Sequence, residues 1–294
     1  MSSFLGFGQM SFMFMNGTNM TLLIWSLLPA AVRSQVTWMY WLWAVLPLAT
    51  MVFVGSFLAI RWMFPPEPIS LVSRRTLVSQ LQVLGPLTHE ERITGSVLIG
   101  VLAAFTTQPL HGIEPAWVAL IGFMVLVATG IVDRDTLRRQ IDWGTVLLLG
   151  ALVGLSDLIR LTGLSDVIGQ LVAPALTPFS GSPVLFLTAC ALVTLLVRFV
   201  VPAQQTALLM LLSLMPIAGR FGYSEFALAV TVLLIGGTWV VPQQQPQYVA
   251  LYSSTDGKLF DHKQVLPLAF VQAAISVVAL IAATPIWQWM GLLK

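Results

Sequence analysis

The sequence predicts an all-α polytopic membrane protein, on the strength of its composition and of long apolar runs that hold no charge. Of its 294 residues, 57% are hydrophobic and only 9% are charged. Soluble domains carry about 25% charged residues, so this chain has too few to cover a water-exposed globular surface. The formal net charge of +2 gives no electrostatic reason to expect nucleic acid as a partner. The lipid bilayer is therefore the predicted environment.

Uncharged apolar runs along the chain are of two lengths. A spanning helix needs about 20 mostly apolar residues, and residues 41–60 and 266–286 reach that length, while 116–132 comes close. Shorter runs lie at residues 20–32, 93–107, 183–197 and 226–241. Unpaired backbone is not tolerated in hydrocarbon, so these interrupted runs predict broken helices that line an enclosed or wet cavity.

Two connections have the pattern of interfacial segments. Residues 69–84 place apolar side chains on one helical face, with Arg74 and Arg75 beyond its edge, as in a helix lying on a membrane surface. Residues 133–142 are interfacial by charge alone. Between them, Thr88 and Glu91 form a capping box that starts the next helix, which explains the acidic cluster there without a metal.

The basic residues predict the orientation of the chain. Nine of them fall in three connections that should be cytoplasmic: Arg61, Arg74, Arg75, Arg92, Arg134, Arg138, Arg139, Lys258 and Lys263. If residues 93–107 and 116–132 form a hairpin of two crossings, the first two connections lie on the same side. The turn between the two crossings carries no Lys or Arg.

A pentapeptide repeat indicates a duplicated architecture. Val-Leu-Pro-Leu-Ala occurs at residues 45–49 and again at residues 265–269. Each copy opens a long span, and a polar break inside an apolar segment lies upstream of each. Two halves of opposite direction would give an inverted-repeat transporter.

Arg198 is the charged residue that most needs an explanation. The apolar arms 183–197 and 207–215 suggest a re-entrant hairpin with Arg198 to Thr206 near its tip. An arginine at membrane depth costs at least ~2.5–3.5 kcal/mol, so it needs a partner. An anionic substrate would suit its planar fork. The alternative is a structural tie to Asp157 or to backbone carbonyls.

Two further polar breaks are candidate binding elements. The first runs from Pro242 to Gln247 and places amide groups and free backbone groups at membrane depth, unless this loop has moved to the interface. The second is Asn16-Gly17-Thr18-Asn19. A helix that begins near Met20 would direct its N-terminal amides at this break and favour negative charge there.

One segment of the chain resembles a known family. The segment is Ile141-Asp142-Trp143-Gly144-Thr145-Val146-Leu147-Leu148-Leu149-Gly150, followed by Leu161-Thr162-Gly163-Leu164. It resembles the divalent anion:sodium symporter family of citrate, dicarboxylate and sulfate permeases. The resemblance implies two inverted repeats, each with a re-entrant hairpin and a broken helix. It also implies that substrate carboxylates and sodium ions bind between these elements, that the substrate-carrying domain moves like an elevator, and that the protein is a homodimer.

The family's motifs transfer only in part. Its Ser-Asn-Thr hairpin tip falls on Ala203, Gln204 and Gln205. The second broken helix keeps Pro242 and Pro246 but carries glutamines and a tyrosine where the family has Gly, Thr, Pro and Asn. In the first repeat Gly17 and Thr18 fit the pattern. Nothing in the chain corresponds to the family's first hairpin, so we expect a truncated first repeat.

The resemblance gives the expected organisation. Residues 1–64 are expected to end the first repeat, residues 65–91 to form a cytoplasmic linker, and residues 92–294 to form the second repeat. The second repeat would contain a hairpin at about 183–219, a broken helix at about 226–255 and a final span at 264–290.

Function is expected to be secondary transport of a small anion, such as a di- or tricarboxylate or a sulfate-like oxyanion, in a bacterial plasma membrane. Coupling to Na⁺ or H⁺ is expected, with no cofactor or metal site, and no nucleophile–base pair suggests an enzyme. The alternative is a truncated, non-transporting subunit or half-transporter that needs a partner chain. The candidate binding residues are Gly17, Thr18, Asn19, Arg198, Ala203, Gln204, Gln205, Thr206, Gln243, Gln244, Gln245, Pro246 and Gln247.

Overall fold

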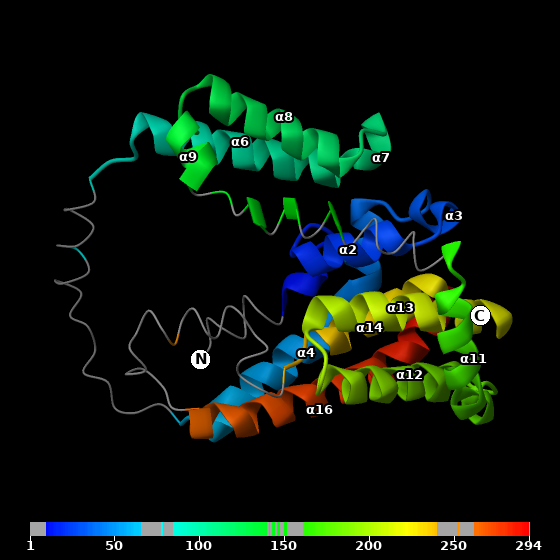
Figure 1. Cartoon of the computed structure of the whole chain (residues 1–294). Coiled ribbons are helices and arrows are strands. Elements are labelled where there is room, and N and C mark those ends of the chain that lie inside the picture. The colour runs from blue at the N-terminus through cyan, green and yellow to red at the C-terminus, as the bar shows by residue number, and fades with distance from the viewer. Residues whose placement is uncertain are drawn as a thin grey trace. The chain divides into compact units, whose positions relative to one another are not determined.

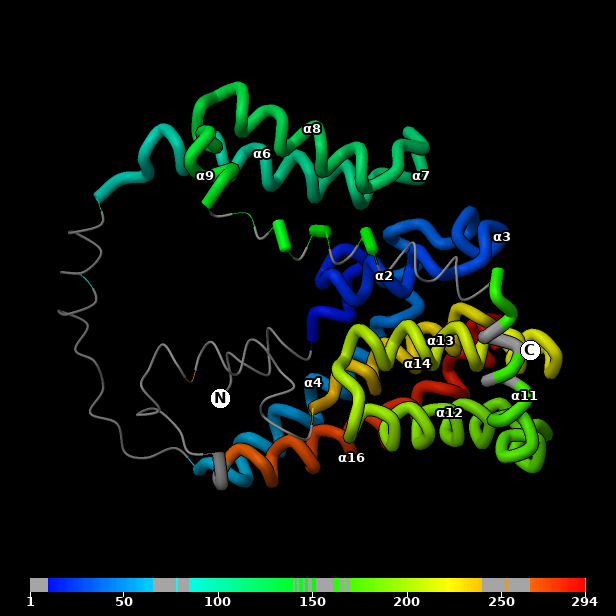
Figure 2. Tube along the Cα trace, in the orientation of Figure 1, coloured from blue at the N-terminus to red at the C-terminus, as the bar shows by residue number. Residues whose placement is uncertain are grey.

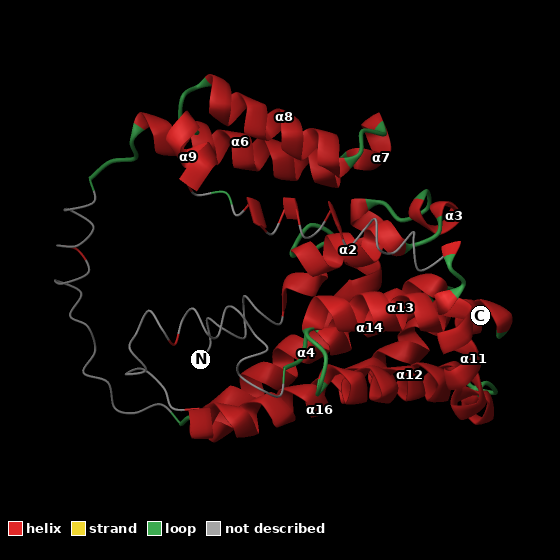
Figure 3. Ribbon diagram, viewed as in Figure 1, coloured by secondary structure: helices red, strands yellow, loops and turns green. Residues whose placement is uncertain are grey.

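The computed structural model consists of helices joined by loops in all the residues that it describes (Figures 1 and 3). Those residues are 10–65, 78, 85–139, 141, 143–144, 146–147, 150–151, 161–239, 252 and 262–293. The chain divides into two compact units, which Figure 2 allows the reader to trace. The first comprises residues 1–36, 40–64 and 147–294, and the second comprises residues 37–39 and 65–146.

Helix α14, Glu225–Gly236, is the central helix of the first unit. Every residue from Phe226 to Gly236 is buried, as expected of a helix that is apolar all round. It packs against α12 (Pro183–Arg198), α13 (Ala203–Arg220), α16 (His262–Trp289) and α2 (Asn19–Leu27). Helices of the first unit therefore surround α14.

Helices α4 (Trp38–Met63) and α16 are the two helices long and apolar enough to cross a membrane among the described residues. They cover the two full-length runs predicted from the sequence, which confirms those runs as helices. The two helices are joined by the indole of Trp287, which donates to the carbonyl of Ala44 at 2.7 Å. Gly55 also allows close contact, because a Cβ there would lie 2.8 Å from Cγ2 of Ile275.

The two copies of the pentapeptide lie in α4 and α16 and are buried in the same pattern. In each copy the valine, the second leucine and the alanine are at most 1% exposed. Pro47 and Pro267 lie inside their helices. The two copies therefore occupy matching buried positions, while the duplicated architecture and the domain boundaries stay predictions.

Helices α12 and α13 contact each other and are joined by residues 199–202, so a helical hairpin covers the segment predicted to be re-entrant. At the other end of this hairpin, the Tyr223 hydroxyl donates to the Ser180 carbonyl at 2.6 Å. The Tyr223 ring stacks on Phe186 with 4.7 Å between centroids. Remaining elements of this unit are η1 (Ser11–Met13), α3 (Ala30–Arg33), α11 (Leu164–Leu176) and η2 (Thr177–Phe179).

The second unit is built on a helical hairpin. Its arms are α6 (His89–Thr106) and α8 (Pro115–Ala128), which contact each other and are linked through α7 (Gln108–His111). The predicted capping box is confirmed: the Thr88 hydroxyl accepts from the Glu91 amide at 3.2 Å, and the Glu91 carboxylate accepts from the Thr88 amide at 2.8 Å. Ile99 and Trp117 are 69% and 60% exposed, which suits helices that contact lipid.

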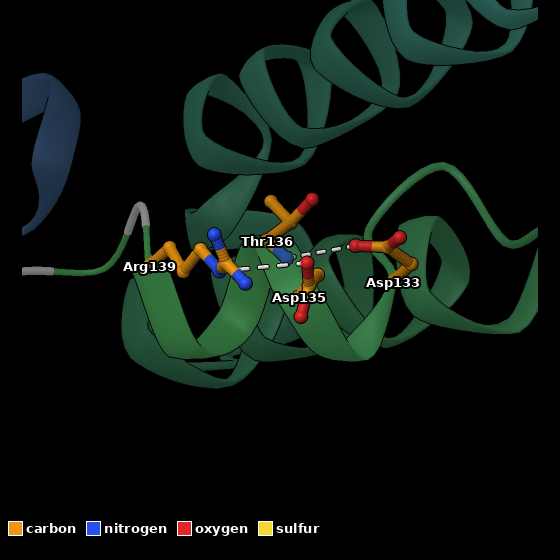
Figure 4. A network of polar contacts seen from close by, with 4 residues as sticks. All are labelled: Asp133, Asp135, Thr136 and Arg139. Atoms are coloured by element: carbon orange, nitrogen blue, oxygen red, sulfur yellow. Dashed lines mark hydrogen bonds and ion pairs between the residues drawn. The ribbon is translucent and has the colours of Figure 1, made fainter.

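A short helix, α9 (Arg134–Arg139), follows α8 (Figure 4). Asp133 caps it, because its carboxylate accepts from the Thr136 amide at 2.7 Å. Arg139 and Asp135 form an exposed ion pair at 3.4 Å, and such pairs contribute only about 0.3–0.5 kcal/mol. Residues 134–139 of the predicted interfacial segment are therefore helical, whereas the predicted amphipathic helix at 69–84 lies outside the described residues apart from Val78.

Candidate functional site

The first candidate break, at Gly17 and Thr18, immediately precedes α2. The hydroxyl of Thr18 accepts from the Thr21 amide at 3.2 Å and lies 2.9 Å from the Thr21 hydroxyl, so it caps the helix. A Cβ on Gly17 would collide with the carbonyl oxygen of Ser11. The helical structure is therefore interrupted at Gly17, and α2 begins at Asn19, next to the predicted start at Met20.

Arg198 is the last residue of α12 and its side chain is fully buried. Its Nε donates to the carbonyl of Gly236 at 3.0 Å, and its Nη1 donates to the carbonyl of Val201 at 3.0 Å. The alternative of a tie to backbone carbonyls thus has direct structural support. Asp157, the other suggested partner, lies outside the described residues.

Thr206 joins Arg198 at the same carbonyl. It lies in the first turn of α13, its side chain is buried, and its hydroxyl donates to Val201 at 3.0 Å. Val201 thus accepts from two candidate site residues that approach from different helices. The turn between α12 and α13 is consequently fixed by side chains as well as by its own backbone.

Gly236, at the end of α14, connects these two breaks, and sequence reasoning missed it. A Cβ on Gly236 would lie 2.6 Å from Cε of Met20 and 3.9 Å from the carbonyl oxygen of Ala203. Met20 is in the first turn of α2 and Ala203 begins α13. The Gly236-Gly237 pair at the end of an apolar helix was the available signal, because adjacent glycines mark backbone that must bend or approach closely.

Four helix ends therefore meet around Gly236: the N-termini of α2 and α13 and the C-termini of α12 and α14. Helix N-termini carry partial positive charge and C-termini carry partial negative charge. Among the residues that the structure describes, no side chain caps the first amides of α13. Such an arrangement can hold an anion at the N-terminal amides and a cation at the C-terminal carbonyls.

The remaining candidate residues are placed as follows. Asn19 and Gln205 are exposed, and Ala203 and Gln204 are partly buried. The third element, Gln243, Gln244, Gln245, Pro246 and Gln247, lies outside the described residues. The structure thus brings Arg198, Thr206 and the start of α2 together, and the binding role of every candidate stays a prediction.

No group of three or more His, Cys, Asp or Glu that could hold a metal is found in the described part of the chain. Cys190 is buried inside α12, as expected of a small apolar side chain.

Comparison with known proteins reveals clear relatives. A family model described as the sodium:sulfate symporter transmembrane region matches residues 3–293. A membrane protein from Cupriavidus necator is 25% identical over 268 residues, which covers 87% of this chain and 51% of that protein. An L-tartrate/succinate antiporter from Escherichia coli K12 is 26% identical over 236 residues, covering 77% and 46% of the two chains.

A third relative, the inner membrane protein YbhI of Escherichia coli K12, is 28% identical over 152 residues, covering 51% of this chain and 31% of the relative. The chain thus spans about half the length, or less, of these curated relatives.

Proposed function

The chain belongs to the sodium:sulfate symporter family, and we propose that it carries a small dianion, such as a dicarboxylate or sulfate, across a bacterial inner membrane. The observation that carries this proposal is the meeting of four helix ends around Gly236, with the buried Arg198 beside them. A relative named as an antiporter of tartrate and succinate makes dicarboxylates the first substrates to test.

The anion would lie at the first turns of α2 and α13. The amides at the start of α13 have no cap from any described side chain, so carboxylate oxygens would bind there. Gln204 and Gln205 of the same turn would add neutral amide donors. Arg198, whose Nη1 donates to the carbonyl of Val201, would attract the anion electrostatically through its positive charge.

Transport would proceed by movement of one part of the chain against another. All candidate residues that the structure describes belong to the first compact unit, whereas the α6–α8 hairpin belongs to the second. This division supports elevator-type alternating access, in which the unit with the site moves as a body. The buried pentapeptides of α4 and α16 support the inverted repeat that such movement uses.

The test is uptake of radiolabelled succinate by proteoliposomes that contain the purified chain, preloaded with succinate, tartrate, sulfate or no solute. We expect uptake to be faster with a trans substrate inside, and to be competed by external tartrate. Homodimer formation, also implied by the family, would be tested by the mass of the purified protein. Coupling to Na⁺ or H⁺ would be tested by imposing each gradient separately.

A second candidate function is a non-transporting subunit or a half-transporter that needs a partner chain. The observation in its favour is that the chain spans about half the length, or less, of its curated relatives. Succinate binding without uptake would favour the half-transporter. Absence of both, across all four preloading conditions, would favour the non-transporting subunit.

A further inference from the structure

We propose that Arg198 takes the place of a coupling cation, so that its guanidinium permanently occupies the carbonyl site where a transporter of this architecture would bind a metal ion. This inference rests on the proposed function, and it excludes Na⁺ as the coupling cation at these carbonyls. It concerns the described residues at the end of α14 and at the α12–α13 turn.

The first argument is the identity of the groups that Arg198 contacts. Gly236 is the last residue of α14, so its carbonyl belongs to the turn whose oxygens lack helical partners. Neighbouring carbonyls are already used within the chain: Leu233 accepts from the Gly237 amide, and Ile235 accepts from the amide and hydroxyl of Thr238. The carbonyl of Gly236 instead receives Arg198.

The second argument is the geometry. The two accepting carbonyls come from separate segments, one ending α14 and one in the turn after α12, and both lie 3.0 Å from guanidinium nitrogens. Carbonyls at the C-terminal ends of half-helices are the groups that coordinate Na⁺ in transporters with broken helices. A guanidinium has five donors in a planar fork and no acceptor, so it can satisfy the same carbonyls that a bare cation would.

The third argument is charge and burial. Arg198 is fully buried, and guanidinium stays charged under all conditions that proteins meet. A charge at this depth is costly without compensation. The Gly236 carbonyl at the negative end of α14 and the Val201 carbonyl in the turn after α12 compensate it, and the proposed anion at the first turn of α13 would add to that compensation. The site therefore carries one positive charge that cannot leave with the substrate.

The consequence is independence from sodium. A mobile cation can stabilise a transporter and assist substrate binding only if no other group already occupies the cation site. Here the side chain already occupies both carbonyls, so added Na⁺ has nothing to bind there. Substrate exchange suits such a site, because no cation needs to be released.

The test measures the melting temperature of the purified full chain in detergent, in NaCl and in choline chloride of equal ionic strength. A ligand that binds only the folded state raises this temperature. We expect no difference between the two salts for the natural chain. Arg198→Ala should have a lower melting temperature than the natural chain in choline chloride. Na⁺, or a few millimolar guanidinium, should raise that melting temperature again, and the increase should saturate with concentration.

Two variants make the result specific. Arg198→Gln keeps hydrogen-bond donors without the charge, so it should also gain the response to Na⁺, and it serves if Arg198→Ala does not fold. Arg220→Ala removes an exposed arginine from the same hairpin and should leave the protein indifferent to Na⁺. A natural chain that Na⁺ stabilises would overturn the proposal, as would Arg198 variants that neither Na⁺ nor guanidinium stabilises.

Uptake separates this inference from the function beneath it. Succinate uptake that is equal in NaCl and choline chloride supports both. Uptake that requires Na⁺ overturns the role of Arg198 while leaving transport intact. If no probe is transported, the proposed function fails, and the melting temperatures still decide whether Arg198 fills a cation site.

Discussion

The side chain of Arg198 and the backbone of Gly236 meet at 3.0 Å, and this contact links the hairpin of α12 and α13 to the end of α14. The same glycine leaves room for Met20 at the start of α2. A side chain added at Gly236 would therefore have to displace the terminal methyl group of Met20 at the candidate site. This relationship provides the most direct test of whether the site controls function.

We expect Gly236→Ala to impair succinate uptake, because its Cβ would lie 2.6 Å from Cε of Met20. Since methionine is flexible, the loss of stability should stay within the ~1–3 kcal/mol typical of overpacking. The loss of uptake should be larger than this loss of stability explains. The double variant Met20→Ala/Gly236→Ala should recover uptake. Gly95→Ala is the control, since no described atom lies within 4 Å of a Cβ there. Equal loss of uptake in Gly95→Ala and Gly236→Ala would contradict the role of the site.

The buried pair Ser56 and Gln272 should show energetic coupling between α4 and α16. The Ser56 hydroxyl lies 2.6 Å from the Val52 carbonyl and 2.9 Å from Oε1 of Gln272, and Nε2 of Gln272 is buried with no hydrogen-bond partner in the described structure. Ser56→Ala should cost about 1–3 kcal/mol by leaving the amide unsatisfied. Gln272→Leu should remove most of that penalty in the double variant.

Unfolding of the four proteins in mixed detergent measures this coupling as a double-mutant cycle, with about 0.6–1.7 kcal/mol expected for a hydrogen bond between membrane helices. Thr50→Ala is the matched control, because its exposed hydroxyl donates to the Leu46 carbonyl within the same helix, α4. Additive effects of Ser56→Ala and Gln272→Leu would show that the pair contributes nothing.

The capping box at the start of α6 should contribute measurably to helix stability. Thr88→Ala removes the acceptor for the Glu91 amide, and loss of an N-cap costs about 0.5–2 kcal/mol. Hydrogen exchange at the Glu91 amide should accelerate accordingly, whereas Thr88→Ser should retain protection. Unchanged exchange in Thr88→Ala would mean that neighbouring contacts, not the cap, hold this turn.

Acid should release the cap of α9. Hydrogen bonds from Thr136 hold the pKa of the Asp133 carboxyl below its usual value. A lowered pKa in the folded state means that the stabilisation is present above the unfolded value, about 3.9, and is lost as the pH falls through the folded value. Exchange at the Thr136 amide, followed between pH 2 and pH 6 and corrected for intrinsic rates, should report that loss. Asp133→Asn keeps an acceptor that does not titrate, so its profile should stay flat.

Much of the fold could be predicted because its determinants are local. Apolar runs of spanning length predicted α4 and α16. The capping box of Thr88 and Glu91 predicted the start of α6. The same reasoning placed a helix start near Met20 and a hairpin turn at residues 198–206. These features depend on hydrophobic periodicity and capping within one or two turns of helix, which the order of residues displays directly.

The candidate site was predicted only in part. Arg198 and Thr206 were selected because polar groups in an apolar segment need partners, and both are buried with partners. Gly236 was missed because a glycine in an apolar helix has no chemistry of its own to attract attention. Its importance comes from Met20, Ala203 and Arg198 approaching it, and those residues are far away in the sequence.

Composition and the spacing of apolar and polar residues predicted a membrane protein of helices with polar breaks. They suffice because transfer to lipid and backbone preference depend on residues that are close together in the sequence. The carbonyls that Arg198 contacts and the pairing of the helices emerge from the folded chain. Ser56 meets Gln272 across 216 residues, and Trp287 meets Ala44 across 243. Contacts at such separations follow from how whole helices pack, and packing depends on the shapes of many side chains together.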